Sequence, residues 1–280
     1  MSRGATVRLA VTSDLHFDLG GHLTSPAEVD SLVRRVVADH PDIIVLAGDI
    51  GHGLANLRGC IQAFKNAAPV VAVLAGNHDL WRDEDTNLGS LELFERALPA
   101  LCAEQGAIWL EASSIVIGPV AITGTMAWYD YSAIDAAQSS FTPEQIWQMK
   151  RYANNDAHRI DWHFDDVAMA GRLRGPFLSH LGALCERDEI ERVAVVTHMP
   201  LLDEQMFRKP GDASWGFSNA YFGNLSLGAE VRRQAKVEAI VSGHTHLGRE
   251  GAIPRAGLSP LAYRVVPSDY GDPRHILLEI

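Results

Sequence analysis

The stretch Val73–Asp79, with the sequence VLAGNHD, joins an apolar run to three polar side chains through a single glycine. The apolar run has the character of a buried strand, and glycine lets the backbone turn sharply where the strand ends. Open α/β sheets carry their chemistry at the carboxyl ends of the strands. We therefore predict that Asn77, His78 and Asp79 are presented at the edge of a buried sheet.

Four other apolar runs end in polar side chains in the same way. They are VTSDLH (Val11–His16), IIVLAGD (Ile43–Asp49), AVVTH (Ala194–His198) and AIVSGHTH (Ala239–His246). If these runs are neighbouring strands, their carboxyl ends lie together and the polar side chains converge. The sequence therefore predicts a single site built from segments that are far apart in the chain.

The converging side chains offer a mixture of oxygen and nitrogen donors. The candidate metal ligands are Asp14, His16, Asp49, Asn77, His198, His244 and His246. This mixture suits manganese, iron or zinc better than magnesium or calcium, which favour oxygen alone. Seven ligands are too many for one tetrahedral site but fit two metals that share a carboxylate. Such a pair of metals generates hydroxide and clamps a phosphoryl group.

These motifs, in this order, resemble the motif set of the calcineurin-like metallophosphoesterase superfamily. The segments that carry the resemblance are Asp14–His16, Gly48–Asp49, Gly76–Asp79, His198 and Gly243–His246. The resemblance implies an α/β (α+β) fold, a four-layer α-β-β-α sandwich of two mixed sheets flanked by helices. It also implies a dinuclear metal centre, for which Mn²⁺ is the expected ion and Fe or Zn²⁺ the alternatives.

The resemblance also implies a role for each site residue. Asp14, His16 and His246 would hold the first metal. Asn77, His198 and His244 would hold the second, and Asp49 would bridge the two. His78 would be the acid or transition-state stabiliser at the leaving oxygen, and Asp79 would orient its imidazole.

The remaining pattern predicts the order of helices and strands. Ser25 to Glu28 reads as a capping box, with Pro26 at the first position of a helix. Strands are expected over residues 6–12, 42–47, 70–75, 107–110, 114–117, 120–123, 192–196, 262–266 and 274–280, with another ending at 242, and further helices over 54–67, 90–105 and 225–236. Asp83, Glu84 and Asp85 read as a solvated acidic loop.

Residues 126–187 depart from the strand rhythm and are rich in alanine and aromatic residues. We interpret them as a helical insertion or lid within one metallophosphoesterase domain spanning 1–280, with the last helical stretch interrupted at Gly175–Pro176. Trp128, Tyr129 and Tyr131 could stack on a base or sugar, but we favour packing inside the insertion. Residues 201–223 read as a long loop, and loops of that length are usually functional.

Composition excludes several classes of protein. The chain of 280 residues is 47% hydrophobic, has a net charge of −11 and contains no run of Lys and Arg. An acidic surface disfavours tight binding of a nucleic acid polymer. The isolated cysteines Cys60, Cys102 and Cys185 predict buried free thiols in a reducing compartment. No apolar stretch is long enough to span a bilayer. We expect a cytoplasmic protein and leave its oligomeric state open.

The predicted function is a metal-dependent phosphoesterase that hydrolyses the P–O bond of a small phosphodiester or nucleotide. Attack by a metal-bridging hydroxide is expected to be direct, since no nucleophilic Ser or Cys accompanies the motifs. The alternatives are a phosphomonoesterase or protein phosphatase of the same superfamily. A catalytically silent interaction scaffold ranks last because every ligand and His78 are present.

Overall fold

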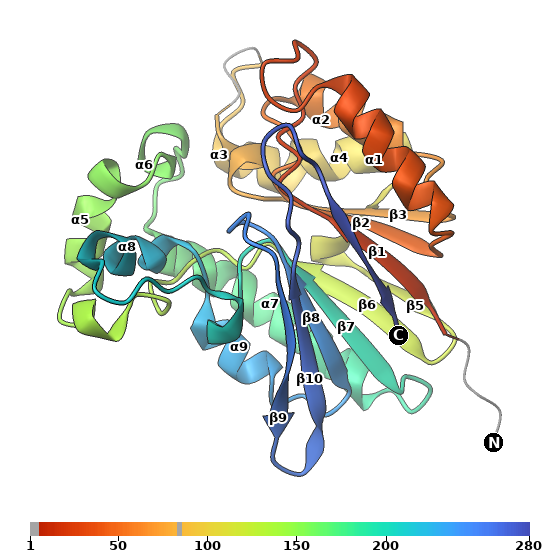
Figure 1. Cartoon of the computed structure of the whole chain (residues 1–280). Helices are drawn as coiled ribbons and strands as arrows, with labels where there is room; N and C mark the ends of the chain where they lie inside the picture. The colour runs from red at the N-terminus through yellow and green to blue at the C-terminus, as the bar shows by residue number, and fades with distance from the viewer. Residues whose placement is uncertain (1–5, 83–85) are drawn as a thin grey trace.

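The computed structural model describes residues 6–82 and 86–280, and shows two β-sheets packed face to face with helices on their outer sides (Figure 1). The expectation of an acidic loop at Asp83–Asp85 lies outside the described residues. Apolar side chains from both sheets form the layer between them, including Val45 and Leu74 of one sheet and Ile122 and Val196 of the other. The four-layer sandwich is therefore confirmed.

The first sheet has the strand order β11-β1-β2-β3-β4. Its strands are β1 (Arg8–Thr12), β2 (Ile43–Ala47), β3 (Val70–Leu74), β4 (Ile108–Trp109) and β11 (His275–Glu279). Neighbouring strands from β1 to β4 are parallel, and β11 is antiparallel to β1. Every residue of β2 is buried, as expected for a parallel strand covered on both faces. The carboxyl ends of β1, β2 and β3 therefore lie at one edge.

The second sheet has the order β5-β6-β7-β8-β10-β9. Its strands are β5 (Ser114–Ile117), β6 (Val120–Thr125), β7 (Arg192–Thr197), β8 (Val237–Ser242), β9 (Arg249–Arg255) and β10 (Leu258–Val265). The expected strands are present, whereas β9 was not predicted. It is an edge strand with mostly exposed side chains and contains Gly251 and Pro254, so it has no apolar run to reveal it.

Helices cover the outer face of each sheet (Figure 1). The helices beside the first sheet are α1 (Pro26–Ala38), α2 (Leu54–Phe64), α3 (Ser90–Glu92) and α4 (Leu98–Gln105). A π-helical turn at Leu93–Ala97 joins α3 to α4. The helices α7 (Asp166–Glu186) and α9 (Leu225–Val231) lie beside the second sheet. The predicted capping box begins α1, because Ser25 Oγ accepts from Glu28 N and the Glu28 carboxylate accepts from Ser25 N.

Two helical predictions need correction. The helix α7 continues through Pro176, where an interruption was expected. Met169 before the proline and Phe177 after it both pack into the apolar core, and this packing holds the helix together despite the lost hydrogen bond. Residues 201–223 are not a plain loop, since they contain α8 (Ala213–Ser218) between short 3₁₀ turns.

Residues 126–187 contain two smaller helices, α5 (Pro143–Ala153) and α6 (Asp156–Arg159), which lie with α8 beyond the ends of the sheets (Figure 1). Trp128, Tyr129 and Tyr131 are all buried. Trp128 Nε1 and Tyr131 Oη donate to the two oxygens of Asp166, at 2.8 and 2.6 Å. The packing interpretation is confirmed, and stacking of these rings on a substrate is wrong.

Among the described residues, no helix combines the length and the apolar composition needed to cross a bilayer. The three cysteines are free thiols; Cys60 and Cys102 are buried and Cys185 is half-buried.

Candidate metal centre

The backbone of the candidate ligands is unusual. Asp14, His16, Asp49, His244 and His246 all have φ between 44° and 66°. Non-glycine residues seldom adopt this left-handed region, and they do so mainly where function requires it. Each of these residues follows a strand end, so the left-handed turn directs its side chain back across the edge where the sheets meet.

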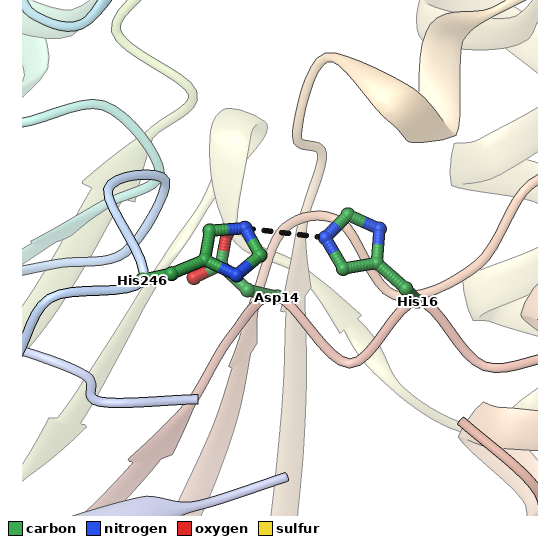
Figure 2. A group of neighbouring side chains, drawn as sticks. All are labelled: Asp14, His16 and His246. Atoms are coloured by element: carbon green, nitrogen blue, oxygen red, sulfur yellow. Dashed lines mark hydrogen bonds and ion pairs between the residues drawn. The ribbon is translucent and has the colours of Figure 1, made fainter. Parts of the chain in front are cut away.

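The first ligand group is Asp14, His16 and His246 (Figure 2). His16 Nε2 lies 3.4 Å from His246 Nε2, and His246 Nε2 lies 3.6 Å from Asp14 Oδ1. Asp14 and His16 follow β1, whereas His246 follows β8, so the group joins the two sheets. The structure thus brings together the three residues that the sequence analysis assigned to the first metal.

The second group is Asp49, His198 and His244, whose ligand atoms lie within 4.8 Å of one another. His198 Nε2 lies 3.4 Å from Asp49 Oδ1 and 3.2 Å from Asn77 Oδ1, so Asn77 belongs with this group. The other oxygen of Asp49 lies 3.9 Å from His16 Nε2 of the first group. Asp49 therefore occupies the position between the two groups that a bridging ligand needs.

Hydrogen bonds at the far nitrogen fix three of the four candidate imidazole ligands. His198 Nδ1 lies 3.0 Å from the Ala47 carbonyl oxygen, His244 Nε2 lies 3.2 Å from the Tyr221 carbonyl oxygen, and His246 Nδ1 lies 3.2 Å from Asp269 Oδ1. An imidazole that donates from one nitrogen presents the lone pair of the other to a metal. The rings are therefore set with their ligand nitrogens toward the cluster.

Burial and mutual repulsion favour neutral imidazoles in part of the cluster. Burial, followed by the nearby histidines, lowers the pKa of His16 to about 2. Burial also places the pKa of His244 well below its ordinary value. For His198, burial lowers the pKa but the carboxylates of Asp49 and Asp14 outweigh it, so the pKa is raised. A neutral imidazole is the form that binds a metal.

Glycine is required at two positions by close approach of the chain. A Cβ at Gly76 would lie 2.1 Å from Asp49 Oδ1 and 2.3 Å from Asp49 N. A Cβ at Gly243 would lie 2.2 Å from Ser13 Oγ and 2.5 Å from Asp14 Oδ2. The glycine of the Val73–Asp79 stretch thus leaves room for Asp49, a reason different from the sharp turn predicted for it.

The segment 126–187 reaches the candidate metal centre through Asp156, which sequence reasoning missed. Asp156 Oδ1 accepts from Asn77 Nδ2 at 3.0 Å and from Trp81 Nε1 at 2.7 Å, and Asp156 Oδ2 accepts from Tyr129 Oη at 2.9 Å. A carboxylate can only accept hydrogen bonds, so the amide nitrogen of Asn77 must face Asp156. This leaves Asn77 Oδ1 directed at His198 and the second ligand group.

The predicted role of Asp79 is wrong. Its Oδ1 accepts from Ile50 N and Gly51 N at 2.8 and 3.1 Å, and its Oδ2 accepts from Gly76 N at 2.8 Å. Within the described chain, these partners are backbone amides and do not include the imidazole of His78. Burial, followed by the charge of Asp49, raises the pKa of Asp79 to about 7. Asp79 ties together the loops after β2 and β3.

His78 is oriented by aromatic packing instead. Its ring stacks on Trp81, with centroids 3.8 Å apart, and meets His16 edge-on at 4.7 Å. Its Nε2 lies 3.9 Å from Asp49 Oδ2, and 23% of its side chain is exposed. The ring of Tyr270 stacks on the ring of His16, with centroids 4.3 Å apart. No strand-end signal marks Trp81 or Tyr270 in the sequence, so both were missed.

The donor set fits two transition-metal ions. It combines the carboxylates of Asp14 and Asp49 with four imidazoles and the Asn77 amide oxygen, divided into two groups that meet at Asp49. Mixed nitrogen and oxygen donors of this kind suit manganese, iron or zinc.

The fold and this donor set define a metal-dependent phosphoesterase, and comparison with known families agrees. The model of the calcineurin-like phosphoesterase family matches residues 7–248, and the chain belongs to this family. It is therefore a metallophosphoesterase, a hydrolase that acts on phosphoric ester bonds.

The individual proteins that this chain resembles share about a quarter of its residues or fewer. The chain is 26% identical over 272 residues to the [acyl-carrier-protein] phosphodiesterase PptH of Mycobacterium tuberculosis, covering 88% of this chain and 74% of the relative. The crystal structure of phosphopantetheinyl hydrolase (PptH) from Mycobacterium tuberculosis superimposes with a TM-score of 0.69 at 20% identity, covering 98% of this chain and 96% of the other. A dimetal phosphatase from Danio rerio gives a TM-score of 0.51 at 14% identity, covering 93% and 87%. At these identities the structural matches show the fold.

Proposed function

We propose that this protein is a two-metal phosphodiesterase. The observation that carries the proposal is the position of Asp49 between two groups of ligands, with one carboxylate oxygen toward each. Asp14, His16 and His246 hold one ion and Asn77, His198 and His244 hold the other. Mn²⁺ is the ion we propose. Two such ions, when bound, lower the pKa of water and polarise the phosphoryl group.

The chain's own residues orient the ester and handle the proton. His78 is the part-exposed imidazole beside Asp49, and it is held in place by Trp81 rather than by a carboxylate. We assign to its Nε2 the proton that is donated to the leaving oxygen as the P–O bond breaks. The candidate ligands include no Ser or Cys nucleophile. We therefore propose that water attacks the phosphorus directly, without a covalent phosphoenzyme.

We further propose that the substrate is a phosphodiester carrying a phosphopantetheinyl group. This proposal is supported by the relative that is named as a phosphodiesterase of acyl carrier protein and matches 88% of the chain. Phosphomonoesters remain the second candidate class, as the sequence predicted.

The experiment is a comparison of esters with the Mn²⁺-loaded protein. The panel contains bis-p-nitrophenyl phosphate, p-nitrophenyl phosphate, a cyclic nucleotide and a carrier protein bearing phosphopantetheine. We expect diesters to be preferred over the monoester in kcat/KM, with two metals per chain measured by elemental analysis. Preference for the monoester would contradict the diesterase assignment, and an inactive protein with two bound metals would favour the scaffold.

Asp49→Asn tests the bridging role in the same assay. The substitution keeps the size of the side chain and removes the anionic charge that is shared by two cations. Metal content and activity should fall together, and further than for a ligand that serves one ion. Two tightly bound metals per chain in the variant would exclude a bridging role for Asp49.

A further inference from the structure

A cavity of about 220 Å³ opens beside two of the candidate metal ligands. It is lined by Phe207, Trp215, Asn219, Phe222, His244, Thr245 and His246. Pockets for whole drug-sized ligands measure roughly 300–1,000 Å³, so this one accommodates a single arm of a substrate. Because His244 and His246 form part of its wall, a substrate arm seated here would lie next to a phosphate bound at the candidate metal centre.

Two buried polar atoms in the wall of this cavity lack partners. Asn219 is completely buried, and neither its Oδ1 nor Thr245 Oγ1 has a hydrogen-bond partner within residues 6–82 and 86–280. Leaving a buried acceptor unpaired costs about 1–3 kcal/mol. Both residues belong to the lining of one cavity, where a bound ligand would supply the missing partners.

The orientation of Asn219 is fixed before any ligand arrives. Its Nδ2 donates to Asp135 Oδ1 at 2.8 Å, and Asp135 is also paired with Arg208. A carboxylate cannot donate, so the amide nitrogen must face Asp135 and the free atom must be the oxygen. Asn219 therefore offers a preset acceptor in the cavity lining, which pairs with an N–H or O–H donor on the ligand.

The rest of the wall is aromatic and held rigid. Trp215 Nε1 donates to the Phe207 carbonyl oxygen at 2.7 Å, and the two rings meet edge-on with centroids 5.6 Å apart. The ring of Phe222 lies 5.8 Å from Trp215 and 5.6 Å from His244. Such a wall suits the methylene groups of an extended chain.

We infer that this cavity is the subsite for the pantetheine arm of the substrate, with Asn219 as the residue that selects an amide-bearing chain. The inference rests on the proposed function. A pantetheine arm combines amide N–H and hydroxyl donors with short methylene segments, which is the pattern that the cavity offers to bind.

The first test uses binding alone, so that it does not depend on catalysis. Pantetheine is titrated calorimetrically into the metal-free wild type, Asn219→Leu and Thr123→Val. Leu has the same branched arrangement of side-chain heavy atoms as Asn, with a larger volume, but no acceptor. Thr123 carries a buried hydroxyl outside the cavity wall that also lacks a partner within the described ranges. We expect about a 10- to 100-fold loss of affinity in Asn219→Leu and none in Thr123→Val. Asn219→Ala replaces Asn219→Leu if thermal unfolding shows that leucine is not accommodated.

A linear diol of matched length, without amides, completes the comparison. Wild type should bind pantetheine more tightly than the diol, and the Asn219 variants should lose this difference. Equal affinity of wild type and the Asn219 variants for pantetheine would overturn the inference, as would the absence of pantetheine binding to wild type.

Turnover separates this inference from the proposed function. If the Mn²⁺-loaded wild type hydrolyses bis-p-nitrophenyl phosphate but the metal-free protein does not bind pantetheine, the subsite is wrong and the phosphodiesterase stands. If pantetheine binds through Asn219 but no diester is hydrolysed, the proposed function is wrong and the subsite stands.

Discussion

At the scale of the residue, the role that we propose for His78 depends on its position, stacked on Trp81 with its Nε2 3.9 Å from Asp49 Oδ2. His78 also lies close enough to His16 and Asp49 to form a third possible metal group with them. Geometry alone therefore allows a ligand or an acid at this position, and the two roles differ in their response to substitution.

His78→Ala should keep both metals and lower kcat by about 10²–10⁴, the usual contribution of a general acid. The loss should be larger for an alkyl ester than for a nitrophenyl ester, because p-nitrophenolate leaves without protonation. Steady-state kinetics on both esters, together with elemental analysis, provides the measurement. Equal losses on both esters would point to electrostatic stabilisation of the phosphoryl oxygens, and a parallel loss of metal would make His78 a ligand.

Asp156 is expected to act on the metal through Asn77. Asp156→Ala leaves the Asn77 amide without its partner and should weaken the affinity of the second metal by about 10- to 100-fold, as is usual when the support of a ligand is removed. Metal titration followed by calorimetry measures this effect.

The insertion offers a matched control in Asp166. Like Asp156 it is buried and accepts from one tryptophan and one tyrosine, but its third partner is Lys150 at 2.7 Å instead of a metal ligand. Asp166→Ala should destabilise the fold by about 3–5 kcal/mol, because it leaves a buried charge unpaired, while metal affinity in the folded protein stays unchanged. Equal loss of metal affinity in both variants would assign a general structural role to Asp156.

The sequence predicted which candidate ligands lie together but not the residues that support them. The candidate ligands follow apolar strands, so strand ends and glycines reveal them. Asp156, Trp81 and Asp269 lie in segments without such a signal and reach the site through tertiary contacts only. Adjacency in sequence also misled the assignment of Asp79, whose oxygens turn away from its neighbour His78 toward backbone amides.

At the scale of the element, the site depends on how closely the loops after β2 and β3 approach. Gly76→Ala places a Cβ against the backbone of Asp49, which cannot move without breaking the cluster. We expect the loss of both metals, and a cost in stability of about 1–3 kcal/mol that is typical of overpacking.

A glycine-to-alanine substitution in a helix serves as the control for Gly76→Ala. Gly171 lies in α7, and a Cβ added there would meet no described atom within 4 Å, so Gly171→Ala should stabilise the protein by about 0.5–1 kcal/mol. Denaturant unfolding of both variants measures the contrast. Metal binding by Gly76→Ala at the wild-type level would show that the loops can separate without loss of the site.

Elements with a local signal were predicted well and elements without one were not. The capping box of α1 and the buried strands β1, β2 and β3 follow from periodicity, turn chemistry and apolar runs. The edge strand β9 and the uninterrupted α7 depend on neighbours that a sequence does not show. For α7, burial of residues on both sides of Pro176 outweighs the local preference of proline to end a helix.

At the scale of the molecule, the metals should contribute to stability, because ligands from β1, β2, β3, β7 and β8 meet at the cluster. At free Mn²⁺ of 100 times Kd, each site adds about 2.7 kcal/mol, and this raises Tm by roughly 5–10 °C in a chain of this size. Differential scanning fluorimetry with and without a chelator measures the shift. Asp49→Asn should show a much smaller one, and a Tm independent of Mn²⁺ would contradict the assignment of the cluster.

The pairing of β1 with β11 brings strands from opposite ends of the sequence together. On the ribosome, the edge of β1 that pairs with β11 stays open until β11 emerges, roughly 15–50 s after β1 at 5–20 residues per second. An open edge of this kind recruits other strands, and long-range pairing is slow. His246 and Asp14 are also separated by most of this interval. The nascent chain must therefore be protected without help from its metals, because the candidate metal sites are complete only after His246 has emerged.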